Sequence, residues 1–117
     1  MVDRVPEVRL TPAATQALAQ RDRRLLVELE LLFSCLVRKR VKFPDSTAKG
    51  YPLTSTQPML ELHFHPIVSH HCKLEEVGVE QPKDDLPLAK PDAFMPRWVS
   101  LDYRHGEWTG DFGYADP

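Results

Sequence analysis

The alternation of apolar side chains between Leu25 and Phe43 constrains the fold more than any other feature of the sequence. The odd positions are apolar with one exception, Lys39, and they are Leu25, Val27, Leu29, Leu31, Phe33, Cys35, Val37, Val41 and Phe43. The even positions are mostly polar or charged, and three leucines stand among them. A period of two indicates a strand with one buried face. We therefore predict one long strand, or two strands joined by a bend, ending at Pro44.

A helix is the alternative for the same segment. Leu25, Leu29, Leu32 and Leu36 also fall at helical spacing, and Leu and Glu are good helix formers. We favour the strand because its odd-numbered face is almost unbroken.

The amino-terminal part predicts a short strand followed by one helix. Residues 5–10 alternate as a strand, and Thr11 is a good N-cap in front of Pro12, which suits the first helical position. The alanine-rich segment after Pro12 should continue the helix to about Gln20 or Asp22. Its small apolar side chains would let it lie close to a sheet.

Further strands are expected on either side of two long loops. Residues 59–65 alternate and should end at Pro66, while residues 98–114 form a hairpin that turns at His105 and Gly106. Residues 44–58 and about 75–97 contain many prolines and should be loops. We predict a single α+β domain over residues 1–117, with the helix packed on one mostly antiparallel sheet that ends in the carboxyl-terminal hairpin.

Charge and hydropathy narrow the classes of partner. The formal charge of −2 gives no overall basic field, which argues against a protein devoted to nucleic acid, and small molecules or proteins are the expected partners. No segment approaches the roughly 20 apolar residues of a membrane span, and the amino-terminal residues lack the pattern of a secretory signal. We expect a cytoplasmic protein.

The segment LELHFHPIVSHHC, residues 60–72, concentrates four of the five histidines and one of the two cysteines. His63 and His65 are two apart in a predicted strand, so both should face the same side and could hold one metal ion. A chain reversal at Pro66 would bring His70, His71 and Cys72 over that pair. These five residues are the predicted metal ligands. Zinc is the first guess, because imidazole with one thiolate suits it, and iron and copper stay open.

Two parts of the sequence approach known His or Cys patterns. Cupins also place His-x-His on a strand, but they need a preceding glycine and a following glutamate that residues 56–61 and 67–71 do not provide. The start VRLTPAATQAL is similar to that of A-type iron–sulfur carriers, which need a glycine-flanked first cysteine and a later Cys-Gly-Cys; Cys35 is flanked by Ser34 and Leu36, and no cysteine follows Cys72. Neither function is carried over.

Two hypotheses of function follow, and a binding protein is favoured over an enzyme in both. The first is a small metal-binding protein with the ligands named above. The second is a metal-free interaction module that binds another protein through a sheet edge or through the aromatic hairpin, where Trp108 and Tyr114 lie. In both hypotheses Cys35, which stands among apolar residues, is expected in the core rather than at a metal.

Overall fold

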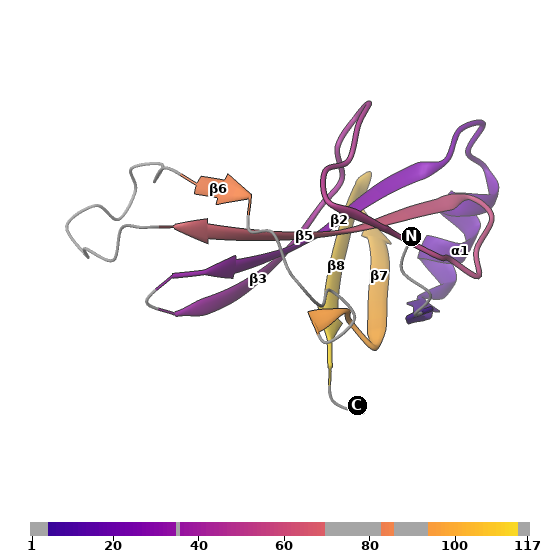
Figure 1. The fold of residues 1–117 in the computed structure, drawn as a ribbon. Helices are drawn as coiled ribbons and strands as arrows, with labels where there is room; N and C mark the ends of the chain where they lie inside the picture. The colour runs from indigo at the N-terminus through magenta and orange to yellow at the C-terminus, as the bar shows by residue number, and fades with distance from the viewer. Residues whose placement is uncertain (1–4, 35, 70–82, 86–93, 115–117) are drawn as a thin grey trace.

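The computed structural model describes residues 5–34, 36–69, 83–85 and 94–114, and Figure 1 shows their arrangement. The elements are β1 (Glu7–Leu10), α1 (Pro12–Ala19), β2 (Leu25–Phe33), β3 (Val37–Lys42), β4 (Tyr51–Leu53), β5 (Leu60–Ser69), β6 (Lys83–Asp85), β7 (Trp98–Arg104) and β8 (Glu107–Gly113). In these described ranges, no helix is long and apolar enough to cross a membrane.

The larger sheet is built on the alternating segment. Its strand order is β3-β2-β5-β4, and β6 pairs with the far end of β5. β2 and β3 are antiparallel neighbours with a bend at Ser34 after β2, so of the two predicted forms the structure has two strands joined by a bend. β2 and β5 are parallel along their whole length, from Leu25 opposite Leu60 to Phe33 opposite Val68.

The smaller sheet has the order β1-β7-β8. β7 and β8 form the predicted hairpin, and both of its turn residues, His105 and Gly106, have positive φ angles of 52° and 80°. Two positive φ values are the signature of the tight turns whose twist matches that of a hairpin. β1 adds to β7 in a parallel pairing.

The core lies between the two sheets, whose strands cross steeply in Figure 1. The odd-numbered residues of β2 and the even-numbered residues Leu60, Leu62 and Phe64 of β5 are buried, and they pack with Val99, Leu101 and Phe112 of the smaller sheet. Leu18 of α1 and Met95 join the same cluster. The odd face of β2 therefore points to the core as predicted, whereas Val37, at the start of β3, is 62% exposed.

The prediction of one sheet was wrong, although the α+β class is right. The hairpin belongs to a separate sheet, and two of the six pairings among the described strands, β1 with β7 and β2 with β5, are parallel. Parallel pairing requires a long connection between partners: residues 34–59, which include β3 and β4, join β2 to β5, and residues 11–97 separate β1 from β7. The alternation of a single strand carries no information about the direction of its neighbour.

Two predicted boundaries also need correction. The expected loop 44–58 contains β4, and the loop about 75–97 contains β6, whereas residues 75–82 and 86–93 lie outside the described part of the chain. β5 does not end at Pro66 but continues to Ser69. β4 and β6 pair with the same edge of β5, β4 up to Phe64 and β6 from Ile67 onward. Pro66 lies between these two paired stretches, so its missing N–H interrupts neither of them.

The amino-terminal helix is fixed to the smaller sheet by Thr11. Its side-chain oxygen accepts a hydrogen bond from Ala14 N and donates one to Asp102 Oδ1 on β7, at 3.1 and 2.6 Å. The backbone N–H of Tyr103 and the side chain of Arg104 also bind this carboxylate. One aspartate therefore joins the helix cap to the hairpin.

We predict that this aspartate makes stability depend on pH in the acid range. The hydrogen bond from Thr11, followed by that from Tyr103 N, holds the pKa of Asp102 below its ordinary value of 3.8. A carboxyl whose pKa is lowered by folding stabilises the fold above its unfolded pKa, and this contribution is lost as the pH falls through the folded pKa. Asp102→Asn should therefore be less stable than the wild type near neutral pH, and the difference should shrink below about pH 4. Urea unfolding across this range measures it, and a difference that does not change with pH would contradict it.

Candidate metal centre

The second face of the larger sheet carries polar side chains that are buried. In the parallel register Glu28 lies opposite His63, and Glu30 lies opposite His65, so all four residues share the face that points away from the core. Glu28, Glu30 and His65 are nevertheless only 5, 3 and 7% exposed. Burying a carboxylate is costly unless it is paired, so each of these groups needs a compensating partner.

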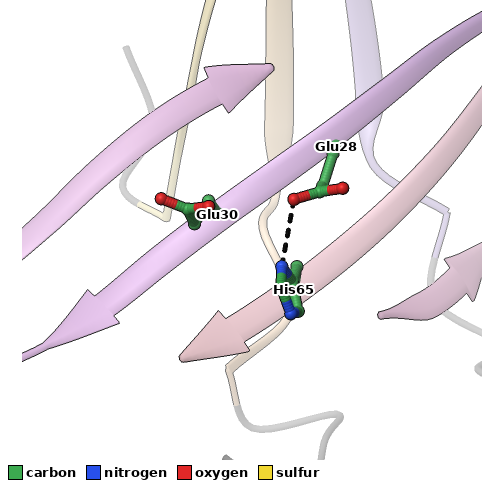
Figure 2. Close-up of side chains that lie close together, drawn as sticks. All are labelled: Glu28, Glu30 and His65. Carbon is green, nitrogen blue, oxygen red and sulfur yellow. Dashed lines mark hydrogen bonds and ion pairs between the residues drawn. The ribbon is translucent and has the colours of Figure 1, made fainter. Parts of the chain in front are cut away.

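Glu28, Glu30 and His65 form a compact triad, which Figure 2 shows across the two neighbouring strands β2 and β5. One ligand atom from each of these residues lies within 4.8 Å of those of the other two. His65 Nδ1 is 3.0 Å from Glu28 Oε2, the contact drawn as a dashed line. Two residues of one strand and one of its parallel neighbour thus place two carboxylates and an imidazole together.

The loop before β4 contacts the triad. The backbone N–H of Lys49 donates to Glu28 Oε1 at 3.0 Å, so each oxygen of Glu28 has a partner. Gly50, with a φ of 102°, lies beside β5 just before the pairing of Tyr51 with Phe64, and a Cβ atom built on it would meet the backbone of Phe64 and His65. The contact from Lys49 is one reason why Glu28 can be buried on a face that carries charged residues.

One basic side chain reaches the triad among the described ion pairs. Lys42 Nζ lies 2.8 Å from Glu30 Oε2. Lys42 brings one positive charge to the two buried carboxylates, and the imidazole of His65 and the N–H of Lys49 both contact Glu28. A divalent cation would balance both carboxylates directly.

The ligand set suits a borderline divalent metal ion. Imidazole is a good ligand for zinc, iron, copper and nickel, and carboxylates suit harder ions such as manganese, so a site with one imidazole and two carboxylates favours Zn²⁺, Fe²⁺ or Mn²⁺. Ligands of a tetrahedral zinc ion lie about 3.4 Å apart, given bond lengths near 2.1 Å. His65 Nδ1 and Glu28 Oε2 are already closer than this, at 3.0 Å, whereas a separation at the limit of 4.8 Å would have to close by about 1.4 Å. Glu30 would also have to exchange Lys42 for the metal.

The two predicted strand histidines lie on one face, but they have different partners. His65 belongs to the triad, whereas His63 Nε2 is 2.9 Å from the carboxylate of Glu61. His63 Nδ1 is buried and has no hydrogen-bond partner among the described residues. The other three predicted ligands, His70, His71 and Cys72, and also Cys35, lie outside the described residues.

The two glutamates were missed at the sequence level, because even positions of an alternating strand were interpreted as facing solvent. One signal was present. Leu26 and Leu32 stand on the same face of β2 as Glu28 and Glu30, which indicates that this face is covered. The register that puts His65 beside Glu30 depends on the parallel pairing, which strand periodicity does not specify.

Comparisons with models of protein families, with curated proteins and with solved structures found no match for this chain.

Proposed function

We propose that this protein binds a divalent metal ion, zinc in the first place, through Glu28, Glu30 and His65. The observation that carries the proposal is the burial of two carboxylates beside an imidazole, with ligand atoms within 4.8 Å of one another. His63 flanks the group on the same face, opposite Glu28, and its buried Nδ1 has no hydrogen-bond partner among the described residues. The role of His70, His71 and Cys72 as further ligands stays part of the proposal.

The balance of charge supports this function. Among the described contacts, the two buried carboxylates meet one lysine, one imidazole and one backbone N–H. Buried ionic networks are usually no more stabilising than apolar packing of the same volume. A metal-binding role gives a reason for this costly arrangement.

The test combines metal analysis with thermal stability. We expect the protein, purified without a histidine tag, to contain zinc or to gain stability when Zn²⁺, Mn²⁺ or Fe²⁺ is added, by about 2.7 kcal/mol when the free metal is at 100 times its Kd. Glu30→Gln keeps the size of the side chain and removes the charged ligand, so the stabilisation by metal should be lost. Differential scanning calorimetry with and without metal measures this.

Glu61→Gln is the matched control. Glu61 is also a glutamate paired with a histidine on this face of the sheet, but it does not belong to the triad. This variant should keep the full response to metal. If the purified wild type contains no metal and does not respond to any of the three metals, the proposed function is wrong, and if Glu30→Gln responds as strongly as the wild type, the metal is bound elsewhere.

The metal-free interaction module is the second candidate, and a specific observation favours one of its two forms. The aromatic rings of the hairpin largely pack on each other: Trp108 lies against Phe43 and Tyr103, and the Tyr114 hydroxyl is buried, which raises the pKa of Tyr114 to about 12. These rings offer little free surface. The edge of β3 is more exposed.

A further inference from the structure

β3 forms one edge of the larger sheet. It stands first in the order β3-β2-β5-β4, and among the described strands β2 is its partner on one side while its other side has none. In Figure 1 the β2–β3 hairpin extends beyond the strands of the smaller sheet. The outer backbone N–H and C=O groups of such a strand are available to pair with another chain.

Two arginines on this strand have no partner within the described residues. Arg38 and Arg40 are both exposed, and they lie on the same side of the strand, opposite Leu32 and Glu30 of β2. The lysines of β3 are engaged: Lys42 pairs with Glu30, and Lys39 donates to the carbonyl of Phe112 and lies near Asp111. The two arginines are therefore the free charges of this edge.

Exposed apolar side chains stand at the start of the same strand. Leu36 and Val37 are 63 and 62% exposed, and together with Val5 and Phe94 they are the large apolar residues that are exposed in the described part of the molecule. Val37 and Arg38 point to opposite faces because successive strand residues alternate. A strand added to this edge would meet arginines on one face and an apolar residue on the other.

We propose that the outer edge of β3 binds an extended acidic segment of a partner protein as an added strand. Carboxylates of this segment would pair with Arg38 and Arg40, and its alternate apolar residues would lie beside Val37. A second copy of this chain is a poor occupant, since pairing of two β3 strands would bring arginines and lysines of like charge together. A nucleic acid cannot use the open backbone edge, and the net charge of −2 opposes it. Arg40 lies opposite Glu30 in the register of the sheet, so this edge borders the triad, but the added strand does not require a bound metal ion.

The test uses a fluorescent peptide of about eight residues in which Glu alternates with Val or Thr, the length of a typical strand. Fluorescence anisotropy at low ionic strength should show binding to the wild type. The double variant Arg38→Glu, Arg40→Glu should weaken binding at least tenfold. Arg23→Glu, Arg24→Glu is the matched control, because it makes the same change of charge at two exposed arginines before β2 and should leave binding within about twofold of the wild type.

Two N-methylated peptides test whether the backbone edge is used. In one the even-numbered residues are methylated and in the other the odd-numbered residues, so each peptide lacks the N–H donors of one side. The peptide that lacks the donors of the pairing side should lose binding. The proposal is overturned if both methylated peptides bind like the parent, if the control double variant is weakened as much as the β3 double variant, or if no peptide binds. It is also overturned if a single-stranded oligonucleotide of equal charge binds more tightly and is the ligand lost from the β3 variant. Circular dichroism of each variant confirms that it is folded.

Discussion

Replacement of Gly50 by alanine is expected to destabilise the protein by more than about 2 kcal/mol. Gly50 has a φ of 102°, which costs a residue with a Cβ atom about 1–2 kcal/mol. A Cβ atom built there would also overlap the carbonyl of Phe64 and lie 2.8 Å from His65 Cα. Both of these groups belong to the backbone of the central strand β5, so they cannot move aside as a flexible side chain can. The alanine variant must therefore lift the loop from the sheet, and urea unfolding measures the cost.

Gly106→Ala separates the two parts of this effect. Gly106 also has a positive φ, 80°, but no atom lies within 4 Å of the position of its Cβ. Gly106→Ala should therefore lower the free energy of unfolding by the conformational cost alone, about 1–2 kcal/mol. If the two variants are equally stable, the close approach of Gly50 to β5 contributes nothing, and the loop does not rest on the sheet as the structure has it.

Gly50→Ala also tests whether the loop supports metal binding. Lys49 precedes Gly50, and its N–H binds Glu28. Displacement of the loop would remove the N–H that holds Glu28 in position beside His65 and would admit water to the triad. Gly50→Ala should therefore weaken metal binding as well, while Gly106→Ala should not.

The sequence predicts the individual helix, strands and turn of this fold better than it predicts which strands pair. The helix after Thr11, the two strands within residues 25–43 and the turn at His105 and Gly106 all follow from local chemistry, namely capping, alternation and the conformational freedom of glycine. The parallel pairing of β2 with β5 does not, because it is decided by core residues far apart in the chain, such as Leu29 beside Phe64. The division into two sheets depends on the same long-range packing.

The candidate site shows the same limit. The strand period places His63 and His65 on one face, and the structure agrees. It does not reveal that the neighbours on that face are Glu28 and Glu30, because their position depends on the register of a parallel partner. Nor does it reveal that the loop ending at Gly50 donates a backbone N–H to Glu28. The histidines were therefore found by their clustering, and the carboxylates beside them only by the structure.

Lys42→Met is expected to lower stability and to strengthen metal binding at the same time. Breaking a buried ion pair by removing one partner costs about 3–5 kcal/mol. The side chain of Glu30 is 4% exposed but that of Lys42 is 42% exposed, so water can partly replace the lysine and we expect a loss of about 2 kcal/mol. The uncompensated carboxylate of Glu30 is then a better ligand, since the metal no longer competes with Lys42. Zn²⁺ should therefore bind more tightly to the variant and recover much of its lost stability.

Two further variants make this prediction specific. Arg38→Met removes a positive charge from the same side of β3, but Arg38 has no carboxylate partner among the described residues, so it should change stability by no more than about 0.5 kcal/mol and leave metal binding unaltered. In the double variant Glu30→Leu, Lys42→Met both charges are replaced by apolar groups, which should restore stability and abolish the response to zinc. Calorimetry and zinc titration of the four proteins measure both effects. If Lys42→Met binds zinc more weakly than the wild type, Lys42 does not compete with the metal for Glu30, and the triad cannot be the site.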